Sequence, residues 1–117
     1  MLTIAVVLFA IAAVGGLVMA VMHFRGQTPP KPALAVVHGL FAASGLVVLL
    51  LAVLPSGASG GPGIALGLFL LAAIGGFALL SFHLRKRALP SALLVAHALL
   101  AVVAFVVLLW TVFAPAA

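Results

Sequence analysis

The chain has 117 residues, of which 68% are hydrophobic and only 4% are charged. A soluble domain of this length could not cover its surface with so few charges, so the composition predicts helices that lie in lipid. Asp, Glu and Cys are absent, which excludes carboxylate acid–base catalysis, thiolate metal sites, covalent c-type haem and disulfides. The formal charge of +5 comes from a few basic residues beside apolar runs, so we expect no nucleic-acid partner.

Two apolar runs separated by a basic, proline-rich turn form the first half of the chain. Residues 2–24 are uncharged apart from one histidine and, at about 1.5 Å per residue, are long enough to cross a bilayer. No basic residue precedes Arg25, so this run predicts a retained span rather than a cleaved signal peptide. The segment 25–32, RGQTPPKP, cannot continue a helix because of its prolines and glycine. The second span is predicted at about residues 33–54.

The second half of the chain follows the same plan. It begins with an uncharged linker at 55–63, PSGASGGPG, whose glycines and serines favour flexibility. Spans are predicted at about residues 64–84 and 91–113, on either side of a second basic turn, RKRALP, at 85–90. The whole chain, 1–117, is expected to form one transmembrane domain.

The two halves also repeat in sequence, which predicts tandem copies at 1–54 and 64–117. Because each copy has an even number of spans, the copies are parallel, and we expect a pseudo-two-fold axis along the membrane normal. Short turns favour antiparallel packing of consecutive helices. The predicted fold is therefore an all-α, four-helix transmembrane bundle made of two helical hairpins. The matching segments are IAAVGG at 11–16 with LAAIGG at 71–76, and LVVLL at 46–50 with FVVLL at 105–109.

Every Lys and Arg lies in one of the two turns, and none lies in the termini or the linker. The positive-inside rule then places both turns in the cytoplasm and both termini outside, and we expect a bacterial inner membrane. These cations are also candidate partners for anions, either haem propionates or lipid phosphates. They are Arg25, Lys31, Arg85, Lys86 and Arg87.

The four histidines are the main candidates for chemistry. In a bundle with this symmetry, His38 and His97 lie diagonally opposite each other, and His23 and His83 form a second facing pair nearer the turns. An ionisable side chain inside a span is costly and usually functional, and no acidic partner exists here. Facing imidazoles are the axial ligands that a haem iron needs. The other readings are interfacial residues for His23 and His83 and a satisfied structural role for His38 and His97.

Small residues lie seven positions from each histidine, towards the membrane centre. Seven residues return nearly to the same helical face, about 10 Å from the imidazole along the axis. A column of small residues at that distance predicts a slot for a flat macrocycle. Close helix packing, which small residues also allow in membrane bundles, explains it as well. The four positions are Gly16, Gly45, Gly76 and Ala104.

Haem b explains the histidines and the small residues together. We expect one haem, with His38 and His97 as iron ligands and His23 and His83 as the alternative pair, because two macrocycles near one face would crowd each other. A chlorin pigment could use the same slot. Zn²⁺ or Cu²⁺ held by the imidazoles, as in a metal-ion transporter, is a further alternative, although an ion alone would leave the small-residue column without a purpose.

The spans and paired histidines resemble, in outline, the bis-histidine four-helix membrane cytochromes such as the cytochrome b561 group. The resemblance includes no sequence motif, and it implies haem held between histidines of facing helices. That group places haems towards both membrane faces, whereas the histidines here lie towards one face. We expect an electron-transfer protein rather than an enzyme, working in the lipid beside a larger membrane redox partner or as a homo-oligomer. The alternative is a structural or assembly subunit whose histidines bind nothing.

Overall fold

The computed structural model describes residues 1–114, and within them the chain forms four long α-helices and no strand. The all-helical fold predicted from the sequence is therefore confirmed. The last residues of the predicted second copy, 115–117, lie outside the described part. The elements in chain order are α1 (Leu2–Phe24), α2 (Pro32–Val53), the short 3-10 helix η1 (Leu54–Ser56), α3 (Gly60–Leu84) and α4 (Ser91–Phe113).

The first helix of each half ends in the same hydrogen-bonded turn. After α1, the Gln27 N–H donates to the carbonyl of Met22 and the Gly26 N–H donates to that of His23. After α3, Arg87 and Lys86 donate to the two equivalent carbonyls. Such a turn satisfies carbonyls that a helix end leaves unpaired, and it needs one residue in the left-handed region. The two basic turns are thus local structures that their own backbone stabilises.

The segment predicted as a linker, 55–63, is mostly helical in the structure. Its first residues belong to η1, and α3 begins at Gly60 rather than near Ile64. Pro62 fits in the first turn of α3 because the N–H groups of a first helical turn have no partner within the helix. The irregular part of the connection is therefore short, 57–59.

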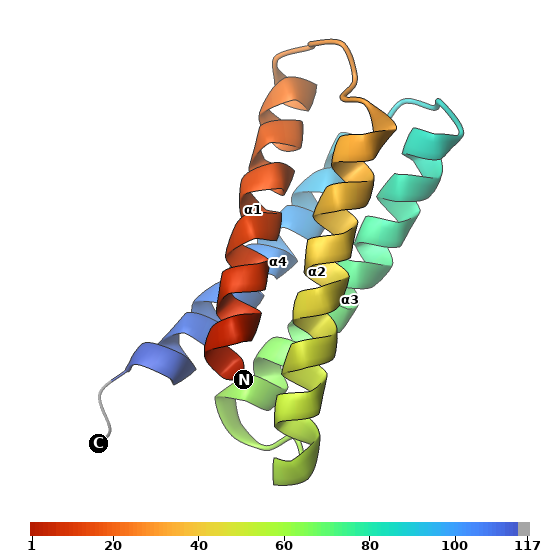
Figure 1. Ribbon diagram of the computed structural model, residues 1–117. Helices are drawn as coiled ribbons and strands as arrows, with labels where there is room; N and C mark the ends of the chain where they lie inside the picture. The colour runs from red at the N-terminus through yellow and green to blue at the C-terminus, as the bar shows by residue number, and fades with distance from the viewer. Residues whose placement is uncertain (115–117) are drawn as a thin grey trace.

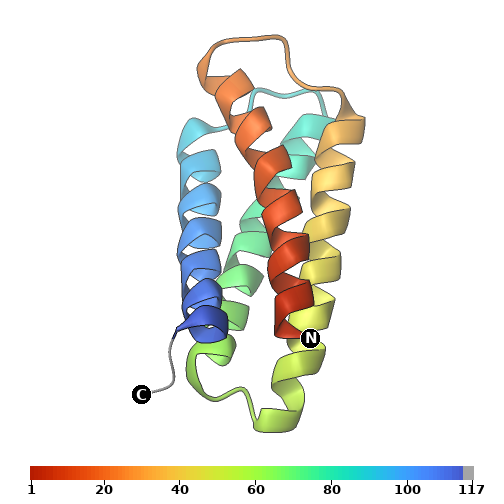
Figure 2. The same cartoon turned by 60° about the vertical axis from the view of Figure 1, so that its left-hand side comes forward.

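The helices pack as two antiparallel hairpins, α1 with α2 and α3 with α4, which meet through α2–α3 and α1–α4. This order places α1 diagonally across the bundle from α3, and α2 across from α4. Both basic turns lie at one end, and the N-terminus, the α2–α3 connection and the end of α4 lie at the other (Figure 1; Figure 2). The predicted four-helix bundle is confirmed, with principal extents of 47 × 22 × 21 Å.

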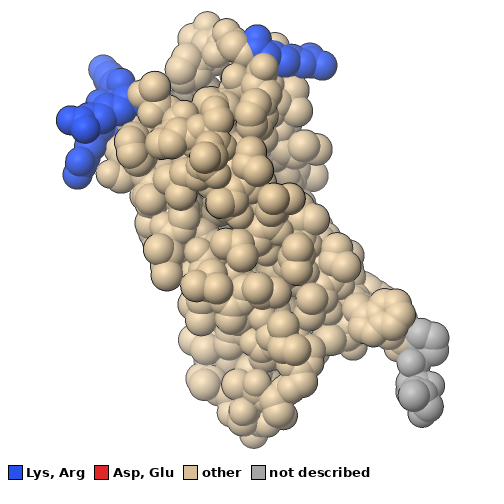
Figure 3. All heavy atoms as spheres, turned by 180° about the vertical axis from the view of Figure 1, so that it is seen from behind, with Lys and Arg blue, Asp and Glu red and all other residues tan. Residues whose placement is uncertain are grey.

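Each of the four helices is long and apolar enough to cross a membrane. Their outward faces are apolar as well: Ile74 and Phe77 on α3 are 67% and 71% exposed. Within the described residues no polar or charged side chain is fully buried. Helices that are hydrophobic on all sides are typical of membrane spans, so the structure suggests a membrane protein. The Lys and Arg side chains gather at the turn end (Figure 3).

The tightest packing lies in the half of the bundle near the termini. The rings of Phe9 on α1 and Phe69 on α3 stack in parallel planes, with centroids 3.7 Å apart. Fully buried leucines from α2 and α4, Leu49 and Leu108, belong to the same cluster. This cluster joins all four helices at that end of the bundle.

Candidate functional site

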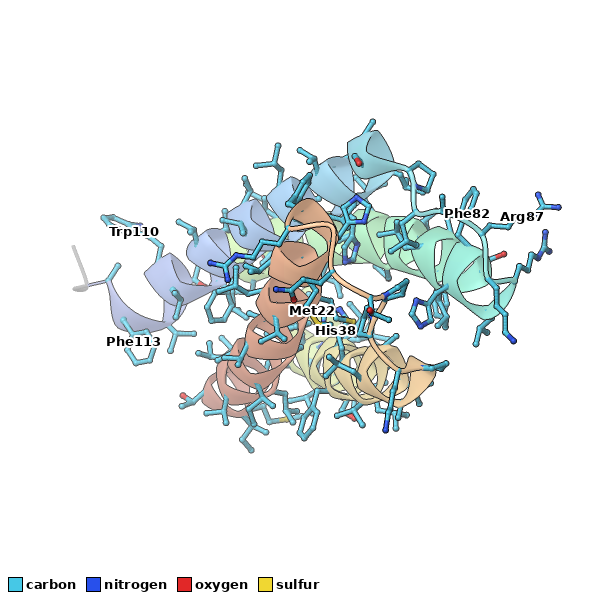
Figure 4. All side chains as sticks on the ribbon, turned by 90° about the horizontal axis from the view of Figure 1, so that it is seen from above. Met22, His38, Phe82, Arg87, Trp110 and Phe113 are labelled. Carbon is cyan, nitrogen blue, oxygen red and sulfur yellow. The ribbon has the colours of Figure 1, made fainter. Side chains whose placement is uncertain are left out.

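His38 on α2 and His97 on α4 meet across the diagonal of the bundle. Their ring centroids lie 6.4 Å apart and their planes are nearly perpendicular, at 79°. Each side chain is half-buried. The structure therefore brings together the two histidines that the sequence places deepest in the spans. We call them the histidine pair; Figure 4 labels His38.

A backbone carbonyl fixes the tautomer of each ring in the histidine pair. The Nδ1 atom of His38 lies 2.7 Å from the carbonyl oxygen of Ala12, and that of His97 lies 2.7 Å from the oxygen of Ala72. A carbonyl can only accept a hydrogen bond, so Nδ1 carries the proton and donates. In the neutral ring Nε2 then has the free lone pair, which is the usual arrangement for a metal-ligating histidine.

Glycine pairs on the neighbouring helices hold the two rings in place. A Cβ built on Gly16 would lie 3.0 Å from Cε1 of His38, and one built on Gly76 would lie 3.1 Å from Cε1 of His97. Gly15 and Gly75 also face the two histidines, with built Cβ atoms 3.6 and 3.4 Å from Cβ of His38 and His97 respectively. These glycines let α1 and α3 approach the imidazoles so closely that the hydrogen bonds to Ala12 and Ala72 can form.

The other two small residues of the predicted column lie one level deeper. A Cβ on Gly45 would lie 3.1 Å from the ring of Phe9, and Ala104 is fully buried in the cluster that contains Phe69. In the structure, Gly45 and Ala104 thus accompany the phenylalanine pair rather than the imidazoles. Phe9 and Phe69 close the bundle below the histidine pair, and we call these two rings the aromatic floor.

The shallower histidines do not repeat this arrangement. His23 Nε2 lies 2.9 Å from Ser91 Oγ, a hydrogen bond that connects the end of α1 to the start of α4. Its ring also contacts Phe24 edge-on, with centroids 5.1 Å apart. His83, the counterpart of His23, is half-buried at the end of α3. The position that matches Ser91 in the first copy is Pro32, which has no hydroxyl to bond a histidine. Across residues 1–114, no three histidines come close enough together to hold one metal ion.

The basic residues lie at the rim of the bundle, above the histidine level. Arg25, Lys31, Arg85, Lys86 and Arg87 are all exposed. Two of them, Arg85 and Arg87, line a hollow of about 80 Å³ together with Ser81 and Phe82. Seen from the turn end, Arg87 and Phe82 lie at the periphery, whereas His38 lies nearer the bundle interior (Figure 4).

Sequence reasoning selected the histidines and the glycines but missed three features of the site. These are the carbonyl acceptors at Ala12 and Ala72, the contribution of Gly15 and Gly75, and the aromatic floor. The sequence repeat could have pointed to all of them. The alanines and glycines lie inside the repeated IAAVGG and LAAIGG segments, and Phe9 and Phe69 occupy matching positions just before them. No protein family, curated protein or solved structure that we compared matches this chain.

The histidine pair offers two imidazoles that could hold a metal. Each ring donates Nδ1–H to a carbonyl, which leaves a lone pair on Nε2 in the neutral ring. The predicted slot for a macrocycle is occupied at the level of Gly45 and Ala104 by the aromatic floor.

Proposed function

We propose that this protein is a membrane-embedded, b-type haem protein that transfers electrons, and that His38 and His97 would hold the haem iron. The observation that carries the proposal is the geometry of the histidine pair: a centroid distance of 6.4 Å between two rings whose Nδ1 atoms are both bonded to carbonyls. When bound, haem supplies one-electron chemistry at its iron. The chain's own residues orient the ligands and control what reaches them.

Holding the ligands is the task of α1 and α3. The Ala12 and Ala72 carbonyls select the Nδ1–H tautomer and increase the basicity of Nε2, as backbone partners of metal-ligating histidines do. The glycines beside each ring remove the side chains that would push the imidazoles away. This support comes from helices rather than loops, which favours a fixed orientation of the two imidazoles.

Excluding water from one side is the task of the aromatic floor. Phe9 and Phe69 are only 6% and 7% exposed, and the cluster around them contains no polar side chain. An apolar shell around a metal centre limits solvent access and shifts its potential. We infer that water and protons reach the histidine pair from the turn side of the bundle.

We further propose that the bundle spans a bacterial inner membrane with both turns in the cytoplasm. The confinement of all Lys and Arg to the turn end supports this orientation. A pseudo-two-fold axis along the membrane normal would relate the two halves, and the matched His38–Ala12 and His97–Ala72 bonds support it. The electron donor and acceptor would be a larger membrane redox protein.

The test is a reduced-minus-oxidised visible spectrum of the detergent-purified protein from cells grown with ample haem. We expect a sharp low-spin b-type α-band that disappears in His38→Ala and in His97→Ala. His23→Ala and His83→Ala are the matched controls and should keep the band. A featureless spectrum of the unmodified protein would overturn the proposal, and a band that survives loss of the histidine pair would assign the iron to other ligands.

A further inference from the structure

The two basic turns have the same backbone but different side chains, and the difference is concentrated after α3. Both turns make the same three backbone hydrogen bonds. In the first turn the sequence after the helix is Arg25, Gly26, Gln27, whereas in the second it is Arg-Lys-Arg at 85–87. The second turn thus carries three consecutive cations on a backbone that the first turn forms with one.

The two turns differ in the residue that adopts the left-handed conformation. Gly26 has a φ of 64°, a region that glycine occupies freely. Lys86 has a φ of 53° at the matching position, although a side chain makes this conformation unfavourable. Unfavourable backbone conformations of this kind are concentrated at functional sites. The second turn thus has a charged lysine where the first turn has glycine.

A hollow beside this turn is built from groups that suit a phosphate. Ser81, Phe82, Arg85 and Arg87 line a space of about 80 Å³, roughly the share of liquid volume of two or three water molecules. Guanidinium groups bind phosphate oxygens with two N–H donors, and a serine hydroxyl can donate a further hydrogen bond. We call these four residues the basic hollow.

The first half of the chain has no equivalent of the basic hollow. The residues that match Ser81, Phe82 and Arg87 in the first copy are Val21, Met22 and Gln27, so only an arginine is common to both. If the cations served only to orient the helices in the membrane, the two charges of the first turn would be enough for the second turn as well. The hollow is thus a feature of the second copy alone.

Location identifies the source of the phosphate. The hollow lies at the end of α3, which is long and apolar enough to span a membrane, and Leu84 beside it is 59% exposed. Arg87 lies at the edge of the bundle, away from the histidine pair (Figure 4), so it is poorly placed for a haem propionate there. The chain has no Asp or Glu to neutralise these cations. A lipid at this level would place its headgroup beside the arginines and its acyl chains beside the apolar helix.

We propose that the basic hollow binds the phosphate group of an anionic phospholipid. The proposal depends on the membrane placement of the bundle but not on haem, so the two can fail separately. It predicts that lipid is retained selectively by the second turn. The first turn, which carries Arg25 and Lys31 at the same end of the bundle, should bind lipid only through general electrostatic attraction.

The experiment compares two double variants that each remove two positive charges from the turn end. Arg85→Gln with Arg87→Gln changes the hollow, and Arg25→Gln with Lys31→Gln is the matched control. Native mass spectrometry of the detergent-purified protein, titrated with phosphatidylglycerol or phosphatidylcholine, measures the bound lipid. Circular dichroism of each variant and the haem spectrum provide folding and cofactor readouts that do not depend on lipid.

We expect the unmodified protein to retain phosphatidylglycerol in preference to phosphatidylcholine. Retention should fall about fivefold or more in the hollow variant, because it removes the two guanidinium groups that line the hollow. It should fall less than about twofold in the control, whose two cations contribute only general attraction that detergent and salt weaken. Equal losses in both variants, or no loss in either, would overturn the proposal. A separate titration of the lipid-loaded protein with inorganic phosphate identifies the source. If phosphate binds in the mass spectrum and displaces phosphatidylglycerol, the free anion is the ligand and the lipid assignment is overturned.

Discussion

The rings of Phe9 and Phe69 stack across the bundle with centroids 3.7 Å apart and an interplanar angle of 2°. They belong to α1 and α3, which lie diagonally opposite each other and whose backbones make no close approach in residues 1–114. The aromatic floor is therefore a direct side-chain contact between these two helices. It also forms the boundary between the apolar half of the interior and the half that contains the histidine pair.

Removing one ring of the aromatic floor should destabilise the bundle. In a membrane the transfer term of the hydrophobic effect disappears, so the cost of Phe9→Ala or Phe69→Ala is that of lost packing and a cavity, about 1–3 kcal/mol of unfolding free energy. Unfolding by a denaturing detergent, followed by circular dichroism, measures this cost. Val7→Ala, at a site 52% exposed on α1, is the control and should have little effect. The double variant should cost less than the sum of the single ones because the rings contact each other.

The glycines beside the histidine pair should not tolerate a methyl group. Gly16→Ala would place a Cβ 3.0 Å from Cε1 of His38, so the ring must move and the bond to Ala12 must weaken. We expect a loss of about 1 kcal/mol or more and a shifted or weakened haem band. Gly39→Ala and Gly67→Ala have open space around the new Cβ and should be neutral or stabilising by up to about 1 kcal/mol. An unchanged spectrum in Gly16→Ala would argue against ring positioning by this glycine.

Replacing His38 by asparagine should distinguish the structural role of Nδ1 from the proposed ligand role of Nε2. The amide of His38→Asn can still donate towards the Ala12 carbonyl, but it offers nothing in place of Nε2. We expect this variant to unfold at nearly the same detergent concentration as the unmodified protein, while His38→Ala loses the interhelical bond, worth about 0.6–1.7 kcal/mol in membrane helices. Both variants should lose the haem band. If His38→Asn keeps the band, Nε2 of His38 is not an iron ligand.

Replacing Lys86, whose backbone is in the left-handed conformation, by glycine should stabilise the protein. Lys86→Gly removes an unfavourable conformation and should raise the free energy of unfolding by about 1 kcal/mol, and Ala58→Gly, at φ 56°, should do the same at the opposite end of the bundle. Only Lys86→Gly removes a charge beside the basic hollow, so only this variant should also retain less phosphatidylglycerol. A loss of stability in Lys86→Gly would show that the lysine side chain makes contacts that outweigh its backbone conformation.

The orientation in the membrane can be tested directly because the chain has no cysteine. Cysteine at Gln27 or Ala88 should react with a membrane-impermeant maleimide only from the cytoplasmic side, and cysteine at Ser59 only from the other side. All three positions lie outside the long helices and are exposed. Inverted membrane vesicles expose the cytoplasmic face to the reagent. Labelling of Ser59→Cys in such vesicles would reverse the proposed topology.

Composition and local chemistry were enough to predict the helices. A chain in which 68% of residues are hydrophobic and no acidic residue occurs has few alternatives to apolar helices, and the prolines of the first turn can only interrupt them. The boundary that differed most was the start of α3, at Gly60 rather than Ile64. Glycine and proline predict a linker there, but a first helical turn tolerates both residues because its N–H groups need no helical partner.

The sequence by itself determined which residues could carry chemistry, because an imidazole inside an apolar span needs a partner and the repeat marks its position twice. Only the tertiary structure decided which neighbours those residues have. It brings His38 and His97 together across the bundle and bonds His23 to Ser91, since side-chain distances across a bundle depend on how the helices are rotated and how far apart they lie. The same packing placed Phe9 and Phe69 where the column of small residues had predicted an open slot. Helical periodicity locates a residue on a face, but the neighbour it meets is a property of the assembled bundle.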